Sequence, residues 1–551
     1  MSFNATFGEP WNGYVGHLSE QIASVPPTRL ALLALVNLPI IAIVLNVLYQ
    51  LLPKDPSRPP VVWHWIPLFG SAASYGQDPI KFYQECGEKY GNIFTFILLG
   101  RRCTVTLGAE GNNFVLGGKH TDLCAEDAYT HLTTPVFGKD VVYDCPNELL
   151  MEQKKFVKFG LRNDNFRTYM PMIEDEVTQF MKKQDHFRIF QMNDINEWGT
   201  FDVLDVMSEI TILTASRTLQ GPEVRDTITA SYADVFSDLD GGFTPIHWLF
   251  PSLPLPSYRK RDIAHKKISD LYVSIIRKRR ESGSKLEAPD MIASLMEQKY
   301  RSGRALKDHE IAHIMIALLM AGQHTSSATG SWLMLHVADH PEIGEALYQE
   351  QVKNFRLPNG KWRTMDFEEI KDLPVLDSVI RETLRVHPPI HSIMRKVRTD
   401  IAVPATLASP SENGTYVVPT GDYVWSSPAV SQLDPRIWKN SNEWDPTRWS
   451  DPQGMAAAAG RAYEDSEGAK IDYGFGLVSK GTDSPYQPFG AGRHRCIGEQ
   501  FAYLQLSSVI ATVIRQVELK LETPFPQPNY QTLITLPKKP RAISYRRRQF
   551  D

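Results

Sequence analysis

Cysteine is scarce in this chain of 551 residues, and its five cysteines include no CxxC pair and no even set that suggests a disulfide framework. Such usage is typical of a reducing compartment. The chain also lacks a strong charge of one sign: its formal net charge of -4 argues against a general nucleic-acid-binding protein. No repeat and no long linker divides it. We therefore expect one large domain with an N-terminal extension rather than the roughly three domains that length alone suggests.

One long hydrophobic run is present at 30–52, and it is long enough to cross a bilayer as a helix. It lacks the basic region and the small-residue cleavage site of a signal peptide. Arg29 before it, and Lys54 and Arg58 after it, favour a cytosolic position for the C-terminal side. Asn4 begins a glycosylation sequon that this topology places in the lumen. The predicted order is a luminal segment at 1–29, a transmembrane helix at 30–52, a stiff proline-rich connector at 53–60 and a large domain at 61–551.

The rest of the chain is predicted to be mainly helical, with a minor β portion. Alternating apolar residues predict a β-hairpin from 93–100 and 104–107. Helical periodicity dominates from 148 to 387, with a break at the prolines of 251–256. Short strands are expected at 401–425 and 530–545, and the Ala-, Gly- and Ser-rich stretch 454–482 is interpreted as a mobile surface insertion.

The most informative segment is FGAGRHRCIG at 489–498, which places Cys496 in a glycine-rich, cationic loop just before a predicted helix. Cysteine binds metal as the thiolate, and nearby arginines, a helix N-terminus and the metal all lower the pKa of a thiol. Gly490 and the other glycines permit a tight turn close to a flat ligand. Phe489 can shield the sulfur from water. An ordinary buried cysteine is the alternative, and the ten matching residues argue against it.

This loop resembles the haem-ligand signature of the cytochromes P450, with Cys496 as the axial ligand of the iron. A thiolate in this position favours O–O cleavage. The family usually has an arginine where this chain has His494, and that departure resembles the sterol 14α-demethylases, in which the histidine meets a haem propionate. The resemblance covers essentially the whole chain. It implies a triangular, mainly helical domain with small β-sheets that holds haem b, preceded by a single N-terminal transmembrane helix.

Glu382 and Arg385 lie on a helix predicted at 375–386, which ends before two prolines. Residues three apart project from one helix face and can pair. An isolated surface pair is worth under ~1 kcal/mol and indicates little. Arg448, in the segment 445–449, completes a set that resembles the structural triad of the cytochromes P450. The resemblance implies that the triad locks the proximal side behind the haem loop.

A long apolar helix is predicted at 311–337, interrupted by AGQHTS at 321–326. Gly322 lets a flat cofactor approach, at a cost of about 1 kcal/mol in helix propensity. The hydroxyl of Thr325 can bond back within the helix, open a groove and then hydrogen-bond bound oxygen or an ordered water. His324 can relay protons near neutral pH. On the residues alone, a packing notch and a core histidine are the simpler interpretations.

The family resemblance favours catalytic roles for these two residues. Most cytochromes P450 have an acid immediately before this threonine, whereas 322–326 here is similar to the sterol 14α-demethylases. The similarity implies that His324 and Thr325 deliver protons in place of an acid–alcohol pair.

The segment 129–144 is similar to the first substrate-recognition segment of the sterol 14α-demethylases, and its aromatic and aliphatic groups suit a rigid, apolar polycycle. By resemblance, the haem propionates meet Tyr129, Tyr143, Lys154, Arg395 and His494. Lys155 and Lys158 either present a cationic patch to an acidic electron donor or form a solvated helix face. Similarity assigns the pocket walls to Leu132, Thr133, Phe137, Phe243, Pro245, Ala321, Ile390, Ser392, Ile393, Leu533 and Ile534.

The resemblance implies the reaction of this family, most like its fungal members. Three successive oxidations, using O₂ and NADPH, would remove the 14α-methyl group of a lanosterol- or eburicol-type sterol as formate in ergosterol biosynthesis. NADPH–cytochrome P450 reductase would supply the electrons, with cytochrome b5 as a further candidate donor. The family and the anchor together imply the endoplasmic reticulum membrane, a cytosolic catalytic domain and a target of azoles. Two alternatives stay open: a cytochrome P450 that hydroxylates another hydrophobic substrate, and a non-catalytic haem sensor or carrier.

Overall fold

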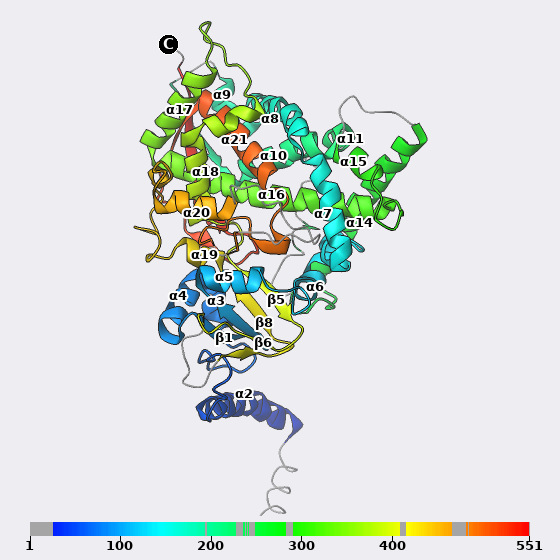
Figure 1. The fold of residues 1–551 in the computed structure, drawn as a ribbon, viewed down its shortest axis with the longest axis vertical. Coiled ribbons are helices and arrows are strands. Elements are labelled where there is room, and N and C mark those ends of the chain that lie inside the picture. The colour runs from blue at the N-terminus through cyan, green and yellow to red at the C-terminus, as the bar shows by residue number, and fades with distance from the viewer. Residues whose placement is uncertain are drawn as a thin grey trace, which may run out of the picture.

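Helix α16 (Asp308–Asp339) runs through the centre of the computed structural model and is buried along most of its length. Its sequence is apolar on nearly all sides, as expected of a helix that other elements surround. It packs against α10 (Val203–Ala215), α14 (Pro256–Ser282) and α21 (Glu499–Gln516), which Figure 1 shows grouped around it. These helices form the larger, mainly helical part of the fold.

The structure describes residues 26–192, 196–227, 235–236, 238–239, 241, 248, 250–282, 290–407, 415–464, 481–482 and 484–549. Phe243 and Pro245, which were predicted to line a substrate pocket, lie outside these residues.

Further helices precede and follow the central group along the chain. The α-helices are α2 (Pro27–Leu51), α3 (Ala72–Gln77), α4 (Pro79–Tyr90), α5 (Gly108–Leu116), α6 (Glu126–Phe137), α7 (Asn147–Gly160), α8 (Asn163–Lys183), α9 (Arg188–Gln191), α11 (Pro222–Thr227), α15 (Met291–Met296), α17 (Pro341–Phe355), α18 (Pro374–Val386), α19 (Pro428–Gln432) and α20 (Met455–Glu464). Short 3₁₀-helices are η1 (Val142–Asp144), η2 (Asp185–Phe187), η4 (Phe367–Asp372), η5 (Pro446–Trp449) and η6 (Gly492–His494), and η3 (Ser216–Gln220) is a π-helix.

The main β-sheet has the strand order β1–β2–β8–β5–β3 and lies below the central helix α16 in Figure 1. β1 (Ile93–Leu98) and β2 (Arg101–Thr106) are antiparallel, which confirms the predicted hairpin. β2 pairs in parallel with β8 (Tyr423–Ser426), and β5 (Ile393–Val397) joins β8 to β3 (Leu123–Cys124). The sheet therefore brings together segments that are far apart in the sequence.

Three smaller sheets complete the β portion of the described chain. β12 (Ala542–Arg547) lies between β4 (Gly199–Asp202) and β9 (Val517–Lys520). β6 (Ile401–Ala402) pairs with β7 (Val417–Val418), and β10 (Pro528–Asn529) pairs with β11 (Leu536–Pro537). The mainly helical fold with small sheets agrees with the prediction, although β4 is a strand inside the region predicted to be helical.

Two local predictions are wrong. α16 is continuous through 321–326, and the Thr325 hydroxyl donates to the Ala321 carbonyl at 2.8 Å without breaking the helix. The stretch 454–482 is not simply a surface insertion, since its first part forms α20 and buries Tyr463 in an aromatic cluster with Trp438 and Tyr486. Residues 465–480 of this stretch are outside the described part of the chain.

Helix α2 lies at the N-terminal end of the structure, below the main sheet in Figure 1. Much of its apolar surface is exposed, including Leu38, Ile41 and Leu45. Its C-terminal half is attached to the domain: the Gln50 side chain donates to the His64 carbonyl at 2.7 Å and accepts from the His64 N–H at 3.1 Å.

Within the part of the chain that the structure describes, no helix combines the length and the hydropathy needed to cross a bilayer. The connector predicted to be stiff and extended instead contains a turn at 56–57, and the carbonyl of Ser57 accepts a hydrogen bond from the Val417 N–H at 2.8 Å.

Candidate active site

The Cys496 loop is shaped by one glycine in particular. Gly492 has φ +66°, and a Cβ at this position would lie 2.1 Å from the Leu116 carbonyl oxygen. Only glycine fits there. The loop then returns on itself, because the Cys496 N–H donates to the Phe489 carbonyl at 3.0 Å, and α21 begins at Glu499. The loop and the following helix thus have the predicted order.

The Cys496 side chain is accessible to solvent, although protein surrounds it on most sides. This enclosure raises the pKa of the thiol, whereas a hydrogen bond from the Gly498 N–H and the charges of Lys154 and Arg495 oppose the rise. The other cysteines of the chain, Cys86, Cys103, Cys124 and Cys145, are buried. Cys496 is therefore the cysteine that is both accessible and provided with groups that stabilise a thiolate.

Cationic side chains surround this loop. Lys154 on α7 donates to the carbonyls of Arg493 and Arg495, at 3.1 Å each. Burial, together with the charges of Arg395 and Arg493, lowers the pKa of Lys154 to about 8, and a negative charge on Cys496 opposes this shift. Burial and the charges of Arg395, Lys154 and Arg493 also hold the pKa of His494 well below its usual value.

Two tyrosines adjoin this cationic group. The rings of Tyr129 on α6 and Tyr143 on η1 are stacked with centroids 5.2 Å apart, and the Tyr143 ring lies 5.9 Å from that of His494. The Tyr129 hydroxyl accepts a hydrogen bond from the Met394 N–H at 3.0 Å. Burial raises the pKa of both tyrosines, so both keep a neutral hydroxyl that can donate a hydrogen bond.

The group formed by Tyr129, Tyr143, Lys154, Arg395 and His494 suits an anionic ligand. The Arg395 side chain is 97% buried, and its guanidinium donates to the Met394 carbonyl at 2.8 Å. Among the described residues, Arg395 forms no ion pair with a carboxylate. A buried cation without a matching anion is costly. Two propionate groups would supply the missing negative charge, so this group of residues fits haem.

Helix α16 presents an accessible face in the segment predicted to meet haem. Ala321 is exposed and Gly322 and Thr325 are half-buried, although the residues around them on this central helix are mostly buried. A Cβ at Gly322 would meet no atom within 4 Å. The helix therefore leaves open space at Gly322, as the approach of a flat cofactor requires. His324 is half-buried on the same turn.

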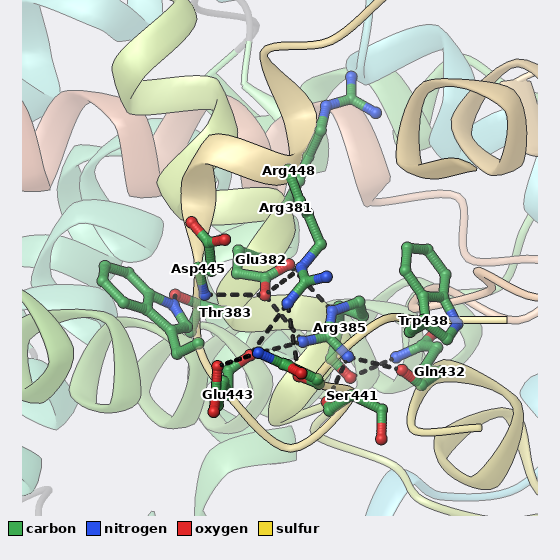
Figure 2. A network of polar contacts seen from close by, with 12 residues as sticks. Arg381, Glu382, Thr383, Arg385, Gln432, Trp438, Ser441, Glu443, Asp445 and Arg448 are labelled. Atoms are coloured by element: carbon green, nitrogen blue, oxygen red, sulfur yellow. Dashed lines mark hydrogen bonds and ion pairs between the residues drawn. The ribbon is translucent and has the colours of Figure 1, made fainter. Parts of the chain in front are cut away.

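The predicted triad residues are in contact (Figure 2). The Glu382 carboxylate accepts from the Arg385 guanidinium at 2.9 and 2.8 Å and from Arg448 Nε at 3.0 Å. The side chains of Glu382 and Arg385 are fully buried, and that of Arg448 is 13% exposed. Arg385 also donates to the carbonyls of Gln432, Ser441 and Glu443. α18 is thereby fixed to the segment that leads to η5.

Three residues of this network were missed by sequence reasoning. The indole N–H of Trp449 donates to Glu382 at 3.0 Å, and only its position beside Arg448 could have indicated it. The Gln432 side chain donates to the Arg385 carbonyl and accepts from the Gln487 N–H at 2.9 Å. The Gln487 carbonyl in turn accepts from the Gly490 N–H at 3.1 Å. A continuous chain of hydrogen bonds therefore runs from Arg385 to the Cys496 loop.

Tyr463 on α20 supports the same loop, and no sequence signal indicated it. Its hydroxyl donates to the Gly490 carbonyl at 2.8 Å, and the Arg495 guanidinium lies 3.8 Å from the centre of its ring. Arg495 also pairs with Glu499, with Nε and the carboxylate oxygen 2.9 Å apart. Phe489 packs with its ring 5.7 Å from that of Tyr503 on α21.

The predicted pocket residues do not all have the same environment. Ile390 and Leu533 are exposed, with 40% and 41% of their surface accessible. Phe137, Ser392, Ile393 and Ile534 are half-buried, whereas Leu132 and Thr133 are buried within the core. The segments around Ile390 and Leu533 are neighbours, because the Thr535 N–H donates to the Pro389 carbonyl at 2.9 Å. The structure thus brings together two of the predicted pocket walls.

Comparison with known proteins agrees with this site. Residues 59–545 match the family Cytochrome P450. The lanosterol 14-alpha demethylase of Mycosarcoma maydis is 54% identical over 92% of this chain and 91% of its own. The lanosterol 14-alpha demethylase erg11 of Schizosaccharomyces pombe is 46% identical over 91% of this chain and 96% of its own.

A solved structure supports the fold independently. The retinoic acid-bound cyanobacterial CYP120A1 superposes with a TM-score of 0.70 over 90% of this chain and 100% of its own, at 19% sequence identity. The two chains therefore share a fold although their sequences have diverged. The more similar relatives show to which branch of the family this chain belongs. The chain belongs to the cytochrome P450 family and, within it, to the sterol 14α-demethylases.

Proposed function

We propose that this protein removes the 14α-methyl group of a sterol as formate, through three successive oxidations that consume O₂ and NADPH. The relatives named above act on lanosterol, and a lanosterol- or eburicol-type sterol is the proposed substrate. The observation that carries the proposal is the accessible thiol of Cys496, next to a cationic group whose buried Arg395 has no carboxylate partner among the described residues. This combination fits a thiolate-ligated haem with two propionates.

The residues that would hold haem divide into three sets. Cys496 would ligate the iron, and Lys154, Arg395, His494, Tyr129 and Tyr143 would bind the propionates. Gly322 would leave room for the plane of the ring, and Phe489 and Gly490 would shape the proximal side. When bound, haem supplies the iron that activates O₂ with electrons from a redox partner, and the thiolate favours O–O cleavage.

Thr325 and His324 would manage protons on the other side of the ring. The Thr325 O–H is donated to the Ala321 carbonyl, so its oxygen keeps lone pairs that can accept a hydrogen bond from a water. His324 is adjacent, and its imidazole offers both a donor and an acceptor for a proton relay. A positioned donor of this kind contributes about 10²- to 10⁴-fold to a rate. The pocket residues would hold the methyl group close to the oxidant, which supplies much of the remaining acceleration.

Membrane attachment is part of the proposal. The exposed apolar surface of α2 continues into Trp65, Ile66, Leu68 and Phe69, each of which is more than half exposed. The proposed order is a luminal segment at 1–29, the anchor at 30–52, a connector at 53–60 and the catalytic haem domain at 61–551 on the cytosolic face of the endoplasmic reticulum.

The proposed electron donor is NADPH–cytochrome P450 reductase, with cytochrome b5 as a further candidate. Lys155 and Lys158 are exposed on α7, the helix that carries Lys154. Charge reversal at Lys155 and Lys158 should raise the reductase concentration needed for half-maximal turnover without changing the KM for sterol. Lys260→Glu on α14, also exposed, is the matched control.

Reconstitution of the full chain with haem, the reductase, NADPH and a 14α-methyl sterol tests the function. Formate and a sterol with a Δ14 double bond are the expected products, and Cys496→Ser should yield neither. A hydroxylated product without formate would instead support a different cytochrome P450 activity. Haem binding without any oxidation of the substrates would support a carrier or sensor.

A further inference from the structure

The loop at 138–145 joins α6 to α7 and carries Tyr143, and a cluster of three histidines from two other helices lies against its first part. His265 lies on α14, and His309 and His313 lie near the start of α16. Figure 1 shows α6 beside the end of α7 and close to α14. The His313 ring lies between the other two, with centroids 5.1 Å from His265 and 5.5 Å from His309.

His309 and His313 bind two consecutive residues at the start of this loop. His313 Nδ1 lies 2.9 Å from the Lys139 carbonyl, so this nitrogen carries the proton and donates it. His309 Nε2 lies 2.9 Å from the Asp140 carboxylate. His265 packs against the His313 ring from α14 and so supports that histidine against the loop.

The fit between His313 and the loop leaves no free space. Gly138 has φ +104°, and a Cβ there would lie 2.4 Å from the His313 ring. The histidine therefore packs directly on the backbone of the loop. His313 is itself 8% exposed, so the contact is shielded from water.

The far side of the loop is held by α6 and α7. The Asp144 carboxylate accepts from the Thr134 hydroxyl and from the Asp140 N–H, at 2.9 Å each. The Gln153 side chain donates to the Asp140 carbonyl at 2.9 Å. The loop is thus fixed between α6 and α7 on one side and the histidines on the other.

The backbone of this loop has unfavourable conformations that its surroundings must hold in place. Asp140 and Val142 have φ values of +66° and +54°, which non-glycine residues rarely adopt and which are especially unfavourable for a β-branched side chain. Such conformations persist only where surrounding contacts impose them. Without the histidine contacts, the loop would relax toward other conformations.

We infer that His265, His309 and His313, together with Asp140, form a clamp that positions Phe137 and Tyr143 for sterol and haem. The inference rests on the proposed function, in which Phe137 lines the pocket and Tyr143 binds a propionate. The clamp residues are positioning residues, because they act through the loop. Loss of the clamp should weaken sterol binding more than it slows the oxidation of bound sterol, since Thr325, His324 and Cys496 stay in place.

The test compares conservative and disruptive variants in the reconstituted holoenzyme. His313→Ala should raise the KM for a 14α-methyl sterol by roughly tenfold and change kcat by less than about threefold, as expected when binding interactions are lost uniformly. His313→Asn should restore most of the affinity, because the amide nitrogen of asparagine can replace Nδ1 as the donor to Lys139.

His309→Ala should have a smaller effect on the KM, because its pair with Asp140 is partly exposed. His309→Gln should rescue that effect, since its amide can replace Nε2 as the donor to Asp140.

His186 offers a matched control, because it forms a similar pair with Glu209 at 3.1 Å and with similar exposure, and it lies in η2 rather than in the histidine cluster. His186→Ala should leave the KM for sterol unchanged. If His313→Ala does not fold, the double variant His309→Ala/Asp140→Ala carries the test, and its KM should rise by roughly threefold. An unchanged KM in the folded variants, or equal losses in His313→Ala and His313→Asn, would overturn the clamp. Failure of the wild-type protein to demethylate sterol would instead contradict the proposed function.

Discussion

Glu382 and Arg385 are both completely buried, and the Glu382 carboxylate accepts two hydrogen bonds from the Arg385 guanidinium. The pair has further partners on all sides, from Arg448 and Trp449 to the carbonyls of Gln432 and Ser441. A buried ion pair is tolerable when its remaining hydrogen-bonding groups are satisfied. This network meets that condition and fixes the segments behind the Cys496 loop.

Removing one partner of the Glu382–Arg385 pair should therefore strongly destabilise the folded protein. Glu382→Ala should lower the free energy of unfolding by about 3–5 kcal/mol, because Arg385 would remain buried and charged without its carboxylate. Asp377→Asn is the control on the same helix, since Asp377 pairs with Arg381 but is 39% exposed. It should cost under ~1 kcal/mol. Urea unfolding of the haem-loaded protein measures both, and equal losses would contradict the structural role of the triad.

Gly492→Ala should prevent formation of the Cys496 loop. The new methyl group would lie 2.1 Å from the Leu116 carbonyl oxygen, in addition to the cost of a positive φ. We expect the variant to retain little haem after purification. Gly360→Ala separates the two causes, because Gly360 has φ +75° with no atom within 4 Å of its Cβ position. That control should lose only about 1–2 kcal/mol of stability and keep its haem.

Gly322→Ala should separate stability from function. Alanine favours a helix by about 1 kcal/mol over glycine, and no atom lies within 4 Å of the new methyl group. The haem-free protein should therefore become more stable, whereas haem content or turnover should fall, because the methyl group would occupy the space in which the proposed function places the ring. Gly76→Ala on α3, which also has open space, should gain stability without loss of turnover. Full haem content and turnover in Gly322→Ala would show that this space is not used.

Acid should destabilise the protein through a buried histidine pair. His336 and His387 contact each other at 2.9 Å, and burial lowers the pKa of His387 to about 3 and that of His336 well below its usual value. The unfolded chain, with ordinary histidine pKa values near 6.5, then binds more protons than the folded protein below that pH. Stability is therefore fully present above about pH 6.5 and falls as the pH drops toward 3, by up to about 1.4 kcal/mol per pH unit for each histidine.

Urea unfolding at pH 7.5 and pH 5.5 measures this dependence. The double variant His336→Gln/His387→Asn should have a lower free energy of unfolding at pH 7.5 but a smaller decrease on acidification. His186→Gln, whose side chain is 31% exposed, should keep the full decrease of the wild-type protein. A double variant as sensitive to acid as the wild type would assign the decrease to other groups.

Glycosylation can report the topology. The chain has a sequon at Asn4 and another at 413–415, on opposite sides of the proposed anchor. With a luminal N-terminus and a cytosolic domain, microsomal expression should glycosylate Asn4 and leave Asn413 unmodified. Asn4→Gln should then abolish the glycosidase-sensitive mass shift, and Asn413→Gln should have no effect. Glycosylation of Asn413 would contradict the proposed topology, because it would place the large domain in the lumen.

The sequence was most informative where function depends on residues that are close together along the chain. The Cys496 loop, the Glu382–Arg385 spacing and the hairpin at 93–107 were each predictable from a local pattern. The family resemblance then connected Arg448 to the pair on α18. These features needed no knowledge of the folded chain beyond helix and turn geometry.

Other features depend on contacts between distant segments. β4 is a strand because it pairs with β12, more than 300 residues later, and no local pattern shows such a partner. Tyr463 was predicted to lie in a surface insertion, although its contacts with Gly490 and Arg495 bury it. Gln432 reaches the Cys496 loop through backbone groups, which carry no sequence signature.

The two hydrogen bonds between Gln50 and His64 fix the orientation of α2 relative to the domain. A helix turns by about 100° per residue. One residue inserted before Gln50 would therefore rotate the apolar surface of the preceding helix by about 100° relative to the domain. In the proposed membrane-bound protein, the membrane would then meet a different side of the domain. Under the proposed anchoring, the number of residues between the apolar surface of α2 and Gln50 would set the side of the protein from which a lipid-dissolved substrate arrives.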